Sequence, residues 1–190
     1  GRLLDGTGAP WFEGDVGIVG DQITAIGNLT GRSAATRIDA SGAYVAPGFI
    51  DMLGQSEFNL LADSRAASKI TQGITTEITG EGSSIAPLND RLAAEARAQF
   101  DSFKVTLDFR TLGEYFTRLE TRSRPALNVG TFVGAGGLRS YVIGDTQRAA
   151  TAGELEQMKT LVREAMAQGA LGLSTSLQYV PDRFASTDEI

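Results

Sequence analysis

The first 47 residues alternate short apolar runs with turn-forming residues. Val16 to Val19 is one such run, and the dipeptide Gly20-Asp21, typical of tight hairpin turns, follows it. The next run, Gln22 to Ile26, has apolar side chains at its second and last positions. Alternation on this short scale is typical of β-strands. The pattern therefore predicts a small β unit over residues 1–47.

From residue 48 onward, strand-length apolar runs alternate with segments of helical length. Strands are expected over 48–52, 74–79, 126–133 and 170–174. Helices are expected over 60–71, 90–100 and 112–121, and a capping-box pattern at Thr151 to Glu154 predicts a further helix start. Strands that alternate with helices form parallel sheets with right-handed crossovers. The predicted fold class is α/β, with about four βα units that form the N-terminal part of a (β/α)8 TIM-like barrel.

Polar residues follow each of the four expected strands. In barrels and in doubly wound sheets, ligands bind at the carboxyl ends of parallel strands, because these ends meet on one side of the fold. The four strand ends lie at 51–57, 80–84, 134–139 and 174–179. We expect them to converge on one binding site.

Glu81 is the candidate metal ligand at the second strand end. It follows the strand 74–79 closely and stands between Gly80 and Gly82, which let a ligand or metal approach the backbone. A carboxylate is a competent ligand for Zn²⁺ or Mn²⁺. Ser83, in the same loop, is expected to line the site. The alternative is that Glu81 is an ordinary solvated loop residue.

The first and third strand ends supply further candidates. Gln55 and Glu57 are expected to line the site, although Glu57 could equally begin the next helix, where a carboxylate suits the helix dipole. The Gly-rich run 134–138 could hold an anion through its backbone N–H groups, with Arg139 as a bidentate clamp for a carboxylate. The alternative for Arg139 is a plain surface residue.

At the fourth strand end, Ser174 and Tyr179 are expected to hydrogen-bond substrate. The alternative is a strand end followed by a partly buried tyrosine. The chain has no His and no Cys. A Ser-His or Cys-His nucleophile pair therefore cannot be completed inside it, and disulfides and thiolate ligands are excluded.

The net charge of the chain argues against two kinds of binding partner. The net charge is −6, and no run of Lys or Arg interrupts the chain, which argues against nucleic acid or an anionic membrane surface. No apolar run approaches the roughly 20 residues needed to span a bilayer. We expect a soluble protein, cytoplasmic or periplasmic. The chain begins without Met and stops just after a fresh helix start, so we interpret it as an N-terminal fragment of a longer protein.

Several stretches together resemble one known family. They are DGTGAP at 5–10, DVGI at 15–18, VAPGFID at 45–51, TQGITT at 71–76, residues 128–139, and GALGLST at 169–175. The chain resembles the amidohydrolase superfamily, specifically the D-aminoacylase (N-acyl-D-amino-acid deacylase) family, from end to end.

The resemblance implies a β-sandwich attached to a metal-dependent hydrolase barrel. Residues 1–47 would be the N-terminal part of the sandwich, and residues 48–190 the first half of the barrel. The family's two later metal-binding histidines and its catalytic aspartate, the general base, would lie beyond Ile190. The chain alone is therefore expected to be inactive, and its unpaired barrel edge is expected to cause association or poor solubility.

Four positions depart from the family pattern. Its His-x-His places hold Leu53 and Gln55, and a later Gly-His-Gly histidine is Ala135. The place of the family's cysteine ligand falls on Glu81. The resemblance then implies one divalent metal, zinc for preference, held by Glu81 and the two later histidines, with a bound water of lowered pKa as nucleophile.

The expected function of the whole protein is hydrolysis of a small-molecule linear amide, an N-acyl-D-amino acid, with Arg139 or Tyr179 holding the substrate carboxylate or acyl group. Two alternatives stay open. One is a catalytically degenerate, amidohydrolase-fold binding protein, and the other is a cyclic-amide hydrolase of the hydantoinase or dihydropyrimidinase kind. Substrate chirality and oligomeric state do not follow from the sequence.

Overall fold

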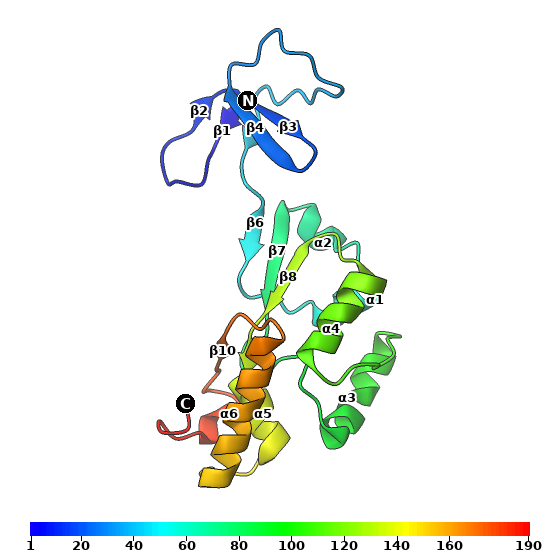
Figure 1. Cartoon of the computed structure of the whole chain (residues 1–190), viewed down its shortest axis with the longest axis vertical. Coiled ribbons are helices and arrows are strands. Elements are labelled where there is room, and N and C mark those ends of the chain that lie inside the picture. The colour runs from blue at the N-terminus through cyan, green and yellow to red at the C-terminus, as the bar shows by residue number, and fades with distance from the viewer. The chain divides into compact units, whose positions relative to one another are not determined.

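The computed structural model describes all 190 residues and is a mixed α/β structure with several small sheets (Figure 1). It divides into two compact units, Gly1–Gly48 and Phe49–Ile190. No helix combines the length and apolar character that a membrane crossing requires.

The first unit consists of short strands: β1 (Arg2–Leu3), β2 (Phe12–Glu13), β3 (Asp15–Val19), β4 (Gln22–Gly27) and β5 (Tyr44–Val45). β1 pairs antiparallel with β2 and parallel with β5. β3 and β4 form an antiparallel hairpin. Gly20 in the turn has φ +63°, a left-handed conformation that glycine adopts without steric cost. The predicted hairpin is confirmed.

The first unit buries little apolar surface by itself. Leu3 is its one buried apolar side chain, whereas Ile18, Val19 and Ile23 of the hairpin are each about two-thirds exposed. Trp11 has a polar neighbour instead, since the Arg2 guanidinium lies 4.9 Å from its ring centroid. A unit of this size gains most of its stability from buried apolar area, and here that area is small.

The second unit is built on parallel strands. β6 (Phe49–Asp51), β7 (Ile74–Thr79) and β8 (Asn128–Thr131) form one sheet in that order, and both pairings are parallel. β9 (Val133–Gly134) pairs parallel with β10 (Leu173–Ser174) in a second sheet. The predicted parallel strands are confirmed. The break between the sheets falls at Phe132, whose N–H donates to Thr79 O at 2.9 Å.

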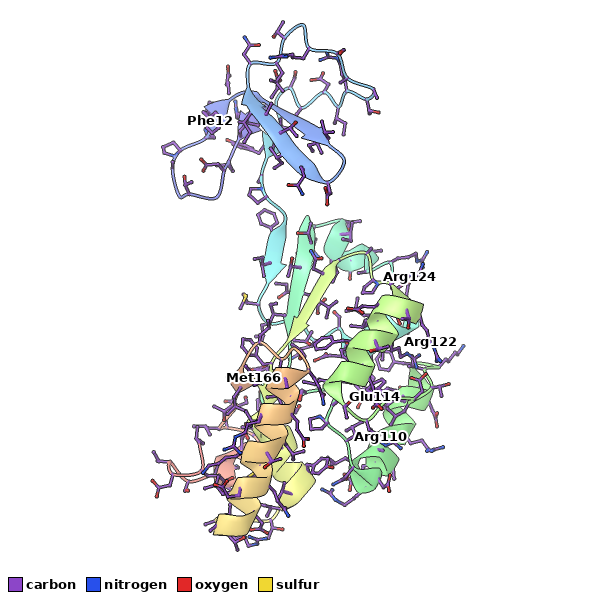
Figure 2. The ribbon with its side chains drawn as sticks, viewed as in Figure 1. Phe12, Arg110, Glu114, Arg122, Arg124 and Met166 are labelled. Atoms are coloured by element: carbon purple, nitrogen blue, oxygen red, sulfur yellow. The ribbon has the colours of Figure 1, made fainter.

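The second unit also contains six α-helices, which join and cover the strands: α1 (Glu57–Ala62), α2 (Ala67–Ile70), α3 (Asp90–Ser102), α4 (Leu112–Arg118), α5 (Ala135–Val142) and α6 (Ala152–Ala167). A π turn, Leu119–Ser123, extends α4, and a 3-10 turn spans Asp182–Phe184. The capping box predicted at Thr151 is confirmed, and a second one opens α4, where the Glu114 carboxylate accepts the Thr111 N–H. Glu114 is labelled on α4 in Figure 2.

Two helix predictions were wrong in detail. The single helix expected over 60–71 is two short helices, separated at Ala66, which has φ +48°. The Gly-rich segment after β9, expected as a loop, begins α5. Leu138 and Arg139 are both buried there, so tertiary packing stabilises a helix that the local glycines disfavour.

The core of the second unit is formed mainly by side chains of the helices and their connecting segments, with Val129 of β8 and Val133 of β9 packed against them. Aromatic rings dominate it: Phe58 and Phe100 meet edge to face at 4.9 Å, and Phe109 lies 5.4 Å from Tyr115. Phe100, Tyr115 and Phe109 are at most 2% exposed. This helix layer fixes the strands whose carboxyl ends carry the candidate site.

Candidate functional site

The loop Gly80–Ser84, after β7, connects the second, third and fourth strand ends. Ser174 Oγ accepts the Gly82 N–H at 3.1 Å and also donates to Gly80 O. On the other side, Ser84 Oγ accepts the Gly134 N–H at 3.3 Å. These strand ends therefore meet as expected, with serine hydroxyls bonded to the backbone of their neighbours.

Glycines allow the loop Gly80–Ser84 to lie directly against the backbone of the third strand end. A Cβ at Gly134 would lie 2.4 Å from Gly82 O and from the backbone of Ser83. The N–H groups of Gly136 and Gly137 donate to Gly82 O at 2.9 and 3.3 Å. The Gly-rich run 134–138 was expected to offer these groups to an anion. In the structure they bind the neighbouring loop, because the two backbones are in contact.

A buried carboxylate completes this junction, and the sequence did not single it out. Asp182 is 3% exposed, and its Oδ2 accepts the Ser176 N–H at 2.6 Å and the Thr175 hydroxyl at 3.2 Å. Its Oδ1 lies 2.8 Å from where a Gly136 Cβ would be. The only local signal is an acid at the start of a short turn after Pro181, which is common at helix starts.

Glu81 is exposed in the middle of this loop, and Ser83 beside it is also exposed. The carboxylate can serve as one metal ligand, because carboxylate oxygens are suitable donors for Zn²⁺. No group of three or more His, Cys, Asp or Glu side chains in the chain is arranged to hold a metal ion. The donors of this chain therefore supply part of a metal site and do not complete one.

The first strand end lies against β7. Gly54 is buried and its N–H donates to Ile78 O at 2.8 Å, whereas Leu53 and Gln55 on either side are exposed. The Ser56 N–H donates to Glu77 Oε1 at 3.1 Å. Glu77 is fully buried, although it is a charged residue in the middle of a strand. The signal in the sequence is its position in the middle of a strand, where a charged residue is uncommon.

Glu57 is the first residue of α1 and is half-buried, so the interpretation as a helix start is confirmed. Burial raises the pKa of its carboxyl, and the nearby charge of Glu77 adds to this. The backbone amides of Glu57 and Gly80 and the approach of the Thr79 hydroxyl oppose the rise in part. Glu57 thus belongs to a polar cluster behind the strand ends.

Tyr115 of α4 belongs to the same cluster. Its hydroxyl is buried without a hydrogen-bond partner, as are Thr79 Oγ1 and Glu77 Oε2. Burial raises the pKa of Tyr115, and the charges of Glu57 and Glu77 raise it further. Polar groups buried in this way are costly to stability.

Arg139 is 1% exposed, so the alternative of a plain surface residue was wrong. Its guanidinium pairs with the Glu189 carboxylate and donates to the carbonyls of Thr146 and Arg148. A carboxylate of this chain therefore already occupies the clamp. Tyr179 is 59% exposed.

No family model matches the chain. The known proteins most similar to it in sequence include several deacylases of one kind. D-aminoacylase from Alcaligenes xylosoxydans xylosoxydans is 41% identical over 195 residues, covering 100% of this chain and 39% of that enzyme. N-acyl-D-aspartate deacylase from the same organism is 38% identical, covering 99% of this chain and 38% of the relative. The chain thus spans about two-fifths of the length of these relatives.

Solved structures similar to this chain are of the same kinds of enzyme. A crystal structure of D-aminoacylase superimposes with a TM-score of 0.86 at 40% identity, covering 100% of this chain and 40% of that one. The same match holds for a D-aminoacylase structure described by a binuclear metal centre with one-metal activation and second-metal attenuation. N-acyl-D-glutamate deacylase from Bordetella bronchiseptica, complexed with zinc and a phosphonate inhibitor, matches with a TM-score of 0.77 at 34% identity, covering 100% and 40%.

Proposed function

We propose that this chain, which belongs to the D-aminoacylase family of amidohydrolases, is part of a metal-dependent hydrolase that acts on the linear amide of N-acyl-D-amino acids. The observation that carries the proposal is similarity over the whole chain, in sequence and in backbone, to enzymes of that single activity class. A fold alone would not support an activity, because one fold hosts many functions. Here the sequence is also about two-fifths identical along the whole chain, and this similarity supports a shared activity where a shared fold would not.

The finer architecture follows from the same relationship. We assign residues 1–47 to the N-terminal part of a β-sandwich and residues 48–190 to the first half of a (β/α)8 barrel. The exposed apolar hairpin of the first unit and the consistently parallel strands of the second support this assignment.

The donors at the first two strand ends suit a single divalent metal, zinc for preference, and Glu81 is the one strong ligand among them. Leu53 carries no donor, and Gln55 offers only an amide oxygen, which is a weak zinc ligand. Glu81 offers an exposed carboxylate at the loop where three strand ends meet. Glu81, together with ligands from outside this chain, would hold a divalent metal there, and such a metal would supply an acidified water for attack on an amide carbonyl.

The residues of this chain would shape the pocket around that metal. Gln55, Ser83 and Tyr179 are exposed near the strand ends and can donate hydrogen bonds to a small N-acyl amino acid. Ser174 acts differently, since its hydroxyl accepts the Gly82 N–H and donates to Gly80 O, which holds the first half of the Gly80–Ser84 loop. Arg139 pairs with Glu189, and we assign it to support of the segment around Glu189 and of the loop that carries Thr146 and Arg148.

A catalytically degenerate binding protein is the second candidate. The specific observation in its favour is that Leu53, Gln55 and Ala135 occupy places where the family pattern has histidines, and no three-residue metal group remains in the chain. Such a protein would keep the pocket and bind an N-acyl amino acid without hydrolysing it.

The experiment that separates these functions uses the whole protein. Elemental analysis measures bound zinc, and hydrolysis is assayed with N-acetyl-D-amino acids and, separately, with hydantoin and dihydropyrimidine substrates. We expect one equivalent of metal and deacylation of the linear amides. Glu81→Ala should lose the metal and at least about 100-fold in kcat/KM, whereas Ser83→Ala, the neighbouring control, should keep its metal. A metal-free protein that binds these amides without turnover would favour the second candidate.

A further inference from the structure

The segment Gly54–Ser56, which follows β6, is hydrogen-bonded to the buried carboxylate of Glu77 in β7. Glu77 stands opposite Asp51 in the parallel pairing of β6 and β7, which lie side by side in Figure 1. Its Oε1 accepts the Ser56 N–H at 3.1 Å. The N–H of Gly54, two residues earlier, donates to Ile78 O at 2.8 Å. Both ends of the tripeptide Gly54–Ser56 are therefore bonded to β7 or to a side chain from it.

Gly54 and Glu77 fit each other sterically. A Cβ at Gly54 would lie 2.1 Å from both Cγ and Oε1 of Glu77, a distance that no side chain can occupy. The glycine is required here by space, since its φ is not among the positive values of the chain. The backbone can lie directly on the carboxylate only because position 54 has no side chain.

Glu77 has one ion-pair partner, Lys69, and shares it with a second carboxylate. Lys69 Nζ lies 3.5 Å from Glu77 Oε1 but 2.5 Å from Asp51 Oδ2, so its shorter contact is with Asp51. Glu77 Oε2 is buried and has no hydrogen-bond partner. Glu57, a second carboxylate, lies close enough for its charge to act on the same cluster. A well-packed apolar side chain of similar size would serve stability at least as well as this carboxylate.

We infer that Glu77 is a positioning residue: through Ser56 and Gly54 it fixes the exposed segment that presents Gln55 to the amide substrate. This inference rests on the proposed function. Gln55 is exposed on a turn, and the Gly54 and Ser56 N–H groups on either side of it tie this turn to β7. Substrate-positioning groups must be held within fractions of an ångström, which a free turn does not provide.

The test compares two replacements of Glu77 in the whole protein. Glu77→Gln keeps a side-chain oxygen for the Ser56 N–H and should stay within about threefold of the wild-type kcat/KM. Glu77→Met fills the same space without an acceptor and should lose about 10- to 100-fold in kcat/KM on an N-acetyl-D-amino acid. The melting temperature of Glu77→Met should not fall below that of Glu77→Gln, because the Gln amide places a polar atom where Glu77 Oε2 is buried without a partner, and Met does not. Glu95→Met, on the exposed face of α3, is the matched control and should change neither quantity.

Amide hydrogen exchange provides a readout that needs no activity. In Glu77→Met the Ser56 amide should exchange up to about tenfold faster, and in Glu77→Gln it should stay protected. Unchanged Ser56 exchange in Glu77→Met would overturn the inference, as would an unchanged kcat/KM in an active protein or a kcat/KM loss that tracks the melting temperature. A wild-type protein that is inactive while Ser56 is protected as described would instead overturn the proposed function.

Discussion

The ammonium of Lys69 in α2 lies 2.5 Å from the Asp51 carboxylate at the end of β6, and both side chains are three-quarters or more buried. The contact lowers the pKa of Asp51, chiefly by the hydrogen bond from Lys69, and raises the pKa of Lys69 in turn. The pair therefore stabilises the fold between the two pKa values. Its contribution is lost as the pH falls through the lowered pKa of Asp51.

Lys69→Met should destabilise the second unit by about 1–3 kcal/mol at neutral pH, because Asp51 is left partly buried without its cation. Urea unfolding of the whole protein measures this. The difference from wild type should shrink in acid, where Asp51 is protonated in both proteins. Lys159→Met, which removes an exposed ion pair on α6, should cost no more than about 0.5 kcal/mol. Equal losses in the two variants would contradict the role given to Lys69.

Glu57 makes the stability of the fold depend on pH in the opposite direction to Asp51. Burial raises the pKa of its carboxyl, so between the ordinary and the raised pKa the folded state binds more protons than the unfolded state. Stability should then fall as the pH rises through that interval. Glu57→Gln cannot titrate and should be more stable than wild type at pH 7, with the difference vanishing near pH 4.

Thermal unfolding at a series of pH values checks the Glu57 prediction. Glu164→Gln, at an exposed position of α6, is the control and should show no such pH-dependent gain. A Glu57→Gln variant whose advantage is the same at pH 4 and pH 7 would show that charge burial is not its cause.

Asp182→Ala should destabilise the fourth strand end by about 2 kcal/mol, because the Ser176 N–H and the Thr175 hydroxyl lose a charged acceptor. Asp182→Asn keeps one oxygen of similar position and should lose less. The exposed Asp188→Ala is the matched control and should lie within about 0.5 kcal/mol of wild type. Denaturant unfolding midpoints rank the three variants, and a neutral Asp182→Ala would exclude the bracing role.

Two threonines of the same helix allow a test of the α6 capping box. Thr151 Oγ1 accepts the Glu154 N–H at 3.3 Å, whereas Thr160, in the helix interior, donates to Glu156 O at 2.9 Å. Thr151→Ala should cost about 1 kcal/mol, and Thr160→Ala should be neutral or slightly stabilising, since alanine favours helix. Thermal unfolding separates the two, and equal effects would mean that the cap contributes nothing particular.

Short-range patterns were sufficient for several elements. The hairpin around Gly20-Asp21, the strand over 74–79 and the helix that begins at Thr151 were all predictable, because turn residues and capping residues act on neighbours a few positions away. The α/β class followed in the same way. The convergence of strand ends also followed, because parallel strands place their carboxyl ends together.

Long-range packing decided which polar residues are buried. Arg139 and Glu81 are both charged residues after strands, yet one is enclosed and paired with Glu189 while the other is exposed. Periodicity cannot distinguish them, since the partner of Arg139 lies 50 residues away. The same reason explains α5, whose glycines favour a loop until Leu138 and Arg139 are packed.

The sequence by itself determined the α/β class, the absence of histidine and cysteine chemistry within the chain, and the family resemblance. Only the tertiary structure decided that Glu77, Glu57 and Tyr115 form one buried polar cluster, and that Asp182 braces the strand ends. The physical reason is that residue type sets which chemistry is possible. The energy of a buried charge depends instead on contacts between distant segments, which form only when the chain is folded.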